Sequence, residues 1–156
     1  MEADYMKEIT NEETKIINVM EKNALQVLND SIIEMHRNKN NISIVLGAMH
    51  LQIAIELYIK NYICKAYGFE NILTDKFKKM RENDSKRYLN ELSNYCIKTL
   101  GFNELKKVLE SNDDYFGFVI KEGKSYLYNS EIEYDYLEGL FEKFQDIRNN
   151  FVHRCV

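Results

Sequence analysis

Apolar residues recur at helical spacing along most of the chain. Between residues 11 and 36 they return every three or four positions, which is the pattern of one buried face of an α-helix. Thr10 followed by Glu13 matches a capping box at the start of that pattern. We therefore predict a first long helix over residues 11–36. The polar, asparagine-rich segment 37–41 then predicts a connection, because asparagine tolerates turn conformations.

A second long helix is predicted over residues 42–67, with Gly68 in the position of a left-handed cap. Its apolar side chains occupy every phase of the helical period, which is typical of a helix in the middle of a bundle. Gln52, Glu56 and Lys60 form its one sustained polar line, since residues four apart stack on one helix face. Because charged and polar side chains interrupt the apolar stretch, we expect a buried core helix and not a membrane span.

Shorter elements are expected in the middle of the chain. Helices are predicted over residues 74–81, 86–100 and 103–110, with Gly101 ending the second of them. The spacing of apolar residues is no longer helical after this point, because residues 115–120 and 125–128 are two β-prone runs around a glycine turn. These runs predict either a small β-hairpin or an ordered loop.

The last predicted helix spans residues 131–153, after a second capping-box pattern at Ser130 and Glu133. Its apolar stripe consists of Leu137, Leu140, Phe141, Phe144, Ile147, Phe151 and Cys155. The sequence shows no internal repeat and no linker. We therefore expect one domain over residues 1–156, an all-α, up-and-down bundle of four principal helices with short extra helices.

The amino-acid composition supports an all-α fold and argues against some kinds of functional site. The chain has 156 residues, no proline and 6 glycines, which favours long helices over a turn-rich β fold. The acidic N-terminus lacks the apolar core of a secretory signal. The 3 cysteines have no C-x-x-C spacing, which argues against a disulfide framework and a thiolate metal site. We expect a cytoplasmic protein with no membrane partner, no metal and no cofactor.

A net charge of −4 means that contact with nucleic acid would need a local basic patch. Segment 76–87 offers one, with cations outnumbering Glu82 and Asp84. This segment is either a surface that contacts phosphates or a solvated polar connection. The cations are Lys76, Lys78, Lys79, Arg81, Lys86 and Arg87.

The last predicted helix ends in the pattern Arg-Asn-x-x-x-His, formed by Arg148, Asn149 and His153. A histidine is suited to moving a proton at a ribose 2′-hydroxyl near neutral pH. An arginine supplies a permanent charge for phosphate oxygens. Asn149 lies four residues before His153, where its amide could orient the imidazole. The three residue types together fit metal-independent cleavage of RNA.

A structural interpretation of the same residues stays open. Arg148 could form a buried ion pair with Glu56, and a histidine near a helix C-terminus is favoured by the helix dipole alone. On an ideal helix, Arg148 and His153 are also roughly 140° apart around the axis. A shared site therefore needs either a long reach by the arginine or two such helices meeting across a two-fold interface.

The segment Arg148–His153 resembles the Arg-x4-6-His signature of the HEPN (higher eukaryotes and prokaryotes nucleotide-binding) superfamily. Residues 50–60 are similar to the Ala-Ile-Glu-x-x-x-Lys-like core helix of many members. The resemblance implies an all-α bundle, commonly a homodimer in which the motif helices of two protomers form a cleft. It implies that Arg148 and His153 are catalytic and Asn149 auxiliary, with Glu56 and Lys60 lining the cleft.

The resemblance also implies a class of activity. Many catalytic members are metal-independent endoribonucleases of toxin–antitoxin, abortive-infection and other defence systems, often paired with a nucleotidyltransferase-type antitoxin. Others bind nucleotides or only scaffold. Three hypotheses follow: an RNA-cleaving homodimer, a non-catalytic module that binds a nucleotide or a protein, and a purely structural bundle in which Arg148 pairs with Glu56.

Overall fold

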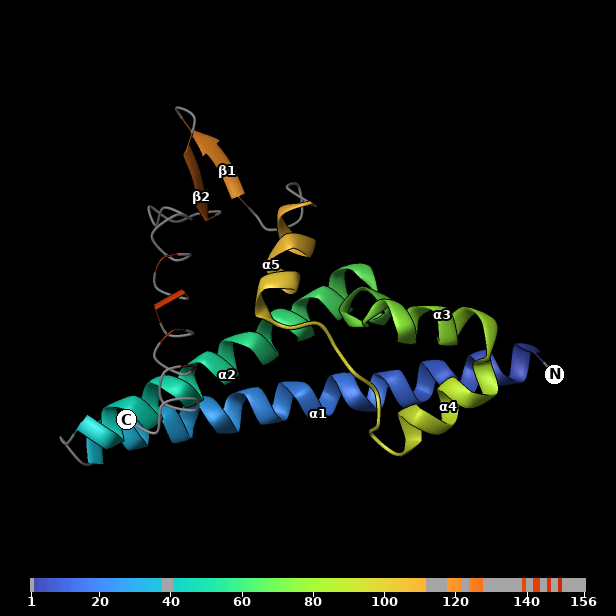
Figure 1. Cartoon of the computed structure of the whole chain (residues 1–156), viewed down its shortest axis with the longest axis horizontal. Helices are drawn as coiled ribbons and strands as arrows, with labels where there is room; N and C mark the ends of the chain where they lie inside the picture. Colours follow the sequence, from blue (N-terminus) through green and yellow to red (C-terminus); the bar gives the residue numbers. More distant parts are fainter. Residues whose placement is uncertain are drawn as a thin grey trace. The chain divides into compact units, whose positions relative to one another are not determined.

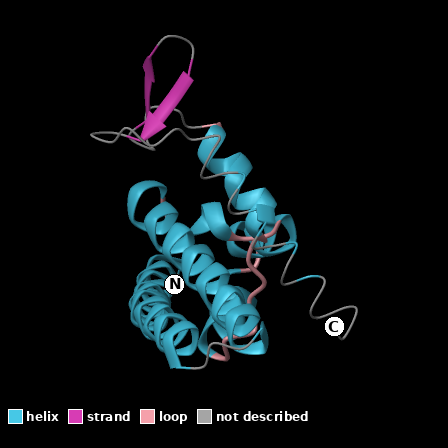
Figure 2. Ribbon diagram, turned by 90° about the vertical axis from the view of Figure 1, so that its left-hand side faces the viewer, coloured by secondary structure: helices cyan, strands magenta, loops and turns pink. Residues whose placement is uncertain are grey.

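The computed structural model describes residues 2–37, 41–111, 118–121 and 124–127, and the single positions 139, 142, 143, 146 and 149. Nearly all of this part is helical (Figure 2), which confirms the predicted all-α class. Figure 1 shows the order of the elements. They are α1 (Glu2–Arg37), α2 (Asn41–Tyr67), the 3-10 turn η1 (Phe69–Ile72), α3 (Asp75–Asn83), α4 (Ser85–Ser93), α5 (Phe102–Glu110), β1 (Phe118–Lys121) and β2 (Lys124–Leu127).

The chain divides into two compact units, and α1 and α2 contribute residues to both. Unit 1 contains Met1–Lys22 and Leu57–Val108. Unit 2 contains Asn23–Glu56 and Leu109–Val156.

Helix α1 begins at Glu2, well before the predicted start. Thr10 lies inside the helix, where its Oγ1 donates to the Met6 carbonyl at 2.9 Å. A mid-helix threonine commonly satisfies its hydroxyl in this way. The carboxylate of Glu13 is bonded to Arg81 and Tyr88, which belong to other helices. The predicted capping box at Thr10 and Glu13 is therefore wrong.

The core of unit 1 is built from large buried side chains of α1 to α5 and of η1. Helix α1 is held against α2 by two contacts, from Asn61 Nδ2 to the Ile17 carbonyl at 3.0 Å and from Lys65 Nζ to Glu21 Oε2 at 2.9 Å. Within this unit the two helices run in opposite directions (Figure 1). Each buried aliphatic or aromatic side chain contributes about 1.5–3 kcal/mol to the stability of the unit. The buried set includes Ile9, Ile16, Met20, Ile63, Phe77, Met80, Tyr88 and Leu92.

Helix α4 ends at Ser93, so the predicted helix over residues 86–100 is wrong in its second half. The Tyr95 amide donates to the Leu92 carbonyl at 3.0 Å, and the Cys96 amide donates to the Glu91 carbonyl at 2.8 Å. These are the two bonds of a Schellman motif, which places Tyr95 at the position that adopts a left-handed conformation. Tyr95 has φ 54°, the one positive φ at a non-glycine residue in the described part of the chain.

After this turn the chain is extended. The Thr74 amide donates to the Lys98 carbonyl at 3.3 Å, and the Leu100 amide donates to the Ile72 carbonyl at 2.8 Å. Residues 98–100 therefore satisfy their backbone groups by pairing with the segment after η1. Gly101 does not end a helix. It precedes α5, where Glu104 Oε2 accepts the Gly101 amide at 3.1 Å.

Gly68 follows α2 as predicted, but not as a left-handed helical cap. Its φ of 106° and ψ of 154° lie in a region that is essentially restricted to glycine. A Cβ at this position would also meet the carboxylate oxygens of Glu70 at 2.7 and 2.8 Å. Glycine is thus needed here for its backbone angles, whereas the Glu70 carboxylate, at the end of a flexible side chain, could move away from a Cβ.

In unit 2, α1 and α2 meet through small residues. Ser31 Oγ donates to the Gly47 carbonyl at 2.7 Å, and a Cβ on Gly47 would lie 2.5 Å from Met35 Cγ. Ser43 and Ala48 are also buried. Because the contact uses the small side chains of α2, the large ones point elsewhere, and Ile42 is 64% exposed.

This finding changes the expectation that α2 is enclosed on all sides. Leu25, Ile32 and Ile33 of α1 and Ile44 of α2 are exposed as well. By length and composition alone, Ile42–Tyr67 could cross a membrane, and no other helix among the described residues could. The core helix of a soluble protein passes the same test.

The predicted hairpin is confirmed in unit 2. Strands β1 and β2 are antiparallel, with Phe118 opposite Leu127 and Lys121 opposite Lys124. The single positions from 139 to 149 all have helical backbone, in agreement with the last predicted helix. The capping box at Ser130 and Glu133 and most of the apolar stripe lie outside the described residues.

Candidate functional site

The polar line on α2 is partly buried. Gln52 is 3% exposed and Lys60 is 9% exposed, while Glu56 is half-buried. Gln52 Nε2 donates to Glu56 Oε2 at 3.4 Å. Burying an amide or an ammonium costs free energy unless it is compensated by polar contacts. A largely apolar helix therefore carries polar side chains at positions where aliphatic side chains could be buried without a desolvation cost.

The Arg-Asn-x-x-x-His pattern falls mostly outside the described residues, which include neither Arg148 nor His153. Asn149 is described: it has helical backbone and is half-buried. On the same segment, Glu142, Lys143 and Asp146 are exposed. The exposed polar positions and the half-buried asparagine fit an amphipathic helix with the motif near its end.

The six cations predicted to contact nucleic acid have different environments. Lys76 and Lys79 on α3 and Lys86 and Arg87 on α4 are exposed, and Lys78 is half-buried. None of these five side chains forms an ion pair with another described residue. Lys76 Nζ lies 5.9 Å from the centroid of the neighbouring Phe77 ring.

Arg81 differs from the other five, because it is bound inside unit 1. Its Nε donates to Glu13 Oε1 at 2.7 Å and its Nη2 donates to Glu13 Oε2 at 3.3 Å. The Tyr88 hydroxyl donates to Glu13 Oε1 at 3.0 Å. Glu13 thus accepts three hydrogen bonds from two other helices. The guanidinium of Arg81 thus belongs to a structural network, and its contact with nucleic acid stays a prediction.

This network affects the pKa of its members. The pKa of Arg81 is raised, chiefly by its hydrogen bond to Glu13. The pKa of Tyr88 is raised well above its usual value, chiefly by burial and then by the negative charge of Glu13. Both shifts favour a charged guanidinium and a neutral phenol at neutral pH. Sequence patterns did not identify this network, because its members are far apart in the chain.

The two cysteines that the structure describes differ in their exposure to solvent. Cys64 on α2 is buried and Cys96 is exposed. Burial raises the pKa of the Cys64 thiol to about 12, with smaller contributions from the charges of Glu13 and Glu70. A thiol with so high a pKa has almost no thiolate at neutral pH and is a poor nucleophile.

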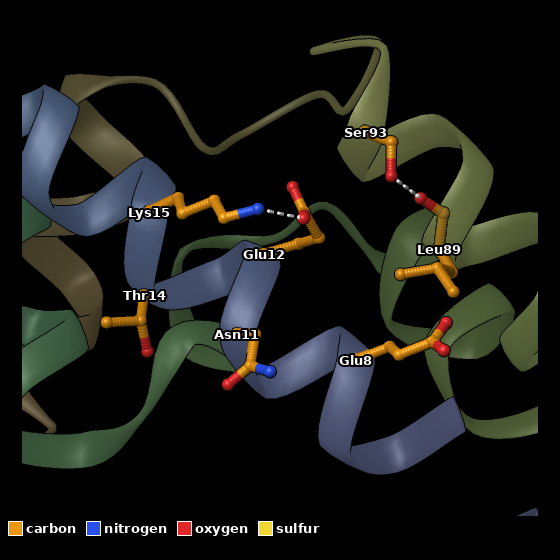
Figure 3. Close-up of a pocket in the computed structure, with 7 residues that line it drawn as sticks. All are labelled: Glu8, Asn11, Glu12, Thr14, Lys15, Leu89 and Ser93. Atoms are coloured by element: carbon orange, nitrogen blue, oxygen red, sulfur yellow. Dashed lines mark hydrogen bonds and ion pairs between the residues drawn. The ribbon is translucent and has the colours of Figure 1, made fainter. Parts of the chain in front are cut away.

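Unit 1 contains an open pocket of about 430 Å³ between α1 and α4 (Figure 3). Six of its seven lining residues are polar or charged, and on its α1 side Lys15 Nζ donates to Glu12 Oε1 at 2.5 Å. Ser93 Oγ, which also faces this region, donates to the Leu89 carbonyl at 2.9 Å. None of the predicted site residues lines it. The lining residues are Glu8, Asn11, Glu12, Thr14, Lys15, Leu89 and Ser93.

Among the described residues, no three histidine, cysteine, aspartate or glutamate side chains gather closely enough to hold a metal ion. Comparison of the chain with models of known protein families, with curated proteins and with solved structures finds no match. The evidence on function therefore comes from the residues of this chain.

Proposed function

We propose that the chain is a HEPN-like, metal-independent endoribonuclease that acts as a homodimer. The observation that carries the proposal is the polar strip of Gln52, Glu56 and Lys60 on a largely apolar helix, with Gln52 and Lys60 buried and Glu56 half-buried. In the family that the chain resembles, the matching helix lines the RNA cleft. A binding or catalytic role explains why this helix has polar side chains at positions where apolar side chains could be buried at a lower cost in free energy.

The chemistry of the proposal is a transesterification within the RNA strand. The ribose 2′-oxygen attacks the adjacent phosphorus, and the bond from phosphorus to the 5′-oxygen of the next nucleotide breaks. His153 moves protons at these oxygens as general acid or base, and Arg148 stabilises the charge that builds on the phosphate. Asn149 orients the imidazole. The products are a 2′,3′-cyclic phosphate and a 5′-hydroxyl.

A two-fold assembly fits this arrangement, because Arg148 and His153 lie roughly 140° apart on an ideal helix. One protomer's arginine and its partner's histidine could then face one scissile phosphate. Defence systems pair such nucleases with an antitoxin, and a nucleotidyltransferase is the partner that we expect.

The test is incubation of purified protein with total RNA in EDTA, followed by chemical mapping of the ends. We expect cleavage by the parent, leaving 2′,3′-cyclic phosphates, and none by Arg148→Ala or His153→Ala variants that keep the parent's circular dichroism and sedimentation coefficient. Lys143→Ala is a matched control on the same predicted helix, because Lys143 is exposed.

Two outcomes would count against the proposal. Equal cleavage by parent and variants would identify a contaminating nuclease. No cleavage by a folded parent, together with saturable binding of a nucleotide that Arg148→Ala abolishes, would favour the alternative of a non-catalytic binding module.

A further inference from the structure

Tyr95 occupies a position that tyrosine rarely takes. It stands at the left-handed residue of the Schellman motif that ends α4, with φ 54°. Glycine is the usual residue there, because a Cβ raises the energy of this conformation. A residue held in such a conformation is a reason to look for a function that requires its side chain.

The tyrosine ring is also unusually open to solvent. Tyr95 is 66% exposed, the highest value among the large apolar and aromatic side chains of the described residues. A buried position would explain an aromatic residue through packing, but this ring is largely uncovered. The conformational cost and the exposure together favour a ring that is presented for contact with a ligand.

Helix α4 precedes this ring in the chain, and its exposed residues include two cations. Lys86 and Arg87 are exposed near its start, and Asn90 is exposed one turn further on. The opposite face, with Tyr88 and Leu92, is buried in unit 1. Two acids flank the cations on this helix: Asp84 accepts the Arg87 amide at 3.2 Å as the cap of α4, and Glu91 is half-buried.

Ser93, two residues before Tyr95 in the chain, lines the pocket between α1 and α4 together with Lys15.

We propose that Tyr95 and the outer face of α4, with Lys86 and Arg87, bind single-stranded nucleic acid. The ring stacks on a base, and the two cations contact backbone phosphates. Cationic surfaces with exposed aromatic rings bind single strands in this way, because every base has a flat apolar face. The residues of this binding surface are not those of the predicted cleavage motif, and the proposed binding does not depend on cleavage.

Other anionic partners fit these residues less well. An acidic peptide would use Lys86 and Arg87 but has no need for an exposed ring in a left-handed conformation. A lipid surface would require several apolar side chains on the outer face, where α4 has Lys86, Arg87 and Asn90. A duplex keeps its bases stacked inside, so the ring could not reach a base face.

The test measures the affinity of the full-length protein for a fluorescent 2′-O-methyl oligouridylate, which lacks the 2′-hydroxyl that cleavage would need. A matched oligodeoxyuridylate distinguishes RNA from DNA as the preferred strand, and we expect the same ranking of variants for either. Tyr95→Gly should weaken binding about tenfold, since it removes one stacked base. Tyr95→Phe keeps the ring and should bind within twofold of the parent.

Protein stability separates this role from a structural one. Because glycine is favoured at the left-handed position, Tyr95→Gly should unfold at the same temperature as the parent or a higher one. Loss of affinity without loss of stability supports the proposal. If Tyr95→Gly instead lowers the unfolding temperature and keeps the parent's affinity, Tyr95 is a structural residue and the proposal is wrong.

The role of the cations has its own control. Lys86→Gln/Arg87→Gln should reduce the slope of log affinity against log salt by about 1.4, or about 0.7 for each lost phosphate contact. Lys7→Gln/Lys22→Gln removes the same charge from exposed positions of α1 and should leave the slope unchanged. An equal effect of both double variants, or no measurable binding by the parent, would overturn the proposal.

Discussion

Two polar clusters interrupt the apolar parts of this molecule, and they differ in how their residues are distributed over the helices. Glu13 accepts hydrogen bonds from Arg81 and Tyr88, with all three groups paired inside unit 1. Along α2, Gln52 and Glu56 share one long hydrogen bond of 3.4 Å. The first cluster joins three helices. The second is a strip along a single helix.

This difference separates a structural cluster from a candidate functional one. A closed network offsets the cost of burial through its own hydrogen bonds and fixes the positions of α1, α3 and α4 in unit 1. The strip of Gln52, Glu56 and Lys60 runs along one helix, and its place on that helix is the basis of the proposed function. We therefore assign stability to Glu13 and propose a functional role for Glu56.

The largest expected effect on stability comes from breaking the Glu13 network. Glu13→Ala leaves the Arg81 guanidinium, whose side chain is 21% exposed, without its carboxylate. We expect a loss of about 2–4 kcal/mol in the free energy of unfolding, measured by urea denaturation, because a largely buried charge is left unpaired.

Glu12→Ala is the matched control at the neighbouring position. Its partner Lys15 has a side chain that is 64% exposed, and an exposed ion pair contributes about 1 kcal/mol at most. Equal losses in the two variants would show that the Glu13 network is no more important to stability than a surface pair.

A second expected effect appears in alkaline solution. The pKa of Cys64 is raised to about 12 in the folded chain, so the unfolded thiol ionises first as the pH rises. Stability is therefore retained below pH 9 and lost as the pH rises from about 9 toward 12, by up to about 1.4 kcal/mol per pH unit. Cys64→Ala should flatten this dependence.

Cys96→Ala serves as the control for that measurement, because Cys96 is exposed. Tyr88 adds to the loss of stability above pH 10, since its pKa is also raised in the folded chain. A pH dependence that is the same in Cys64→Ala and the parent would contradict the assignment of the effect to this thiol.

A smaller loss is expected from Tyr88→Phe. This change removes the hydroxyl that donates to Glu13 at 3.0 Å and leaves the ring in its buried position. Glu13 keeps both hydrogen bonds from Arg81, so we expect a loss of about 1–2 kcal/mol in the free energy of unfolding. A loss as large as that of Glu13→Ala would mean that the hydroxyl, and not the ion pair, holds the network together.

Sequence patterns predicted local features well and tertiary ones poorly. The range of α2 and the hairpin followed from apolar periodicity and a glycine turn, which are properties of neighbouring residues. The Glu13 network joins positions 13, 81 and 88, so Glu13 was mistaken for a capping residue and the ion pair of Arg81 was not foreseen. The end of α4 was missed because tyrosine, not glycine, occupies the left-handed position.

In the candidate site, too, local features were predicted from the sequence and tertiary features were not. The spacing of Gln52, Glu56 and Lys60 was visible as a polar line on one helix, but their burial was not. The pocket between α1 and α4 was also missed, since its walls come from Glu8–Lys15 and from Leu89 and Ser93. Residues so distant in sequence leave no periodic signal.

The most direct test compares two isosteric changes, Glu13→Gln and Glu56→Gln, by urea denaturation and by RNA cleavage in EDTA. We expect Glu13→Gln to lower the free energy of unfolding by about 2 kcal/mol or more and to cleave RNA normally while it remains folded. Glu56→Gln should unfold within about 1 kcal/mol of the parent, because an amide can keep the contact with Gln52, and should cleave at least tenfold more slowly. If Glu56→Gln instead cleaves like the parent and loses stability, the polar strip of α2 is structural, and the division of roles between the two clusters is wrong.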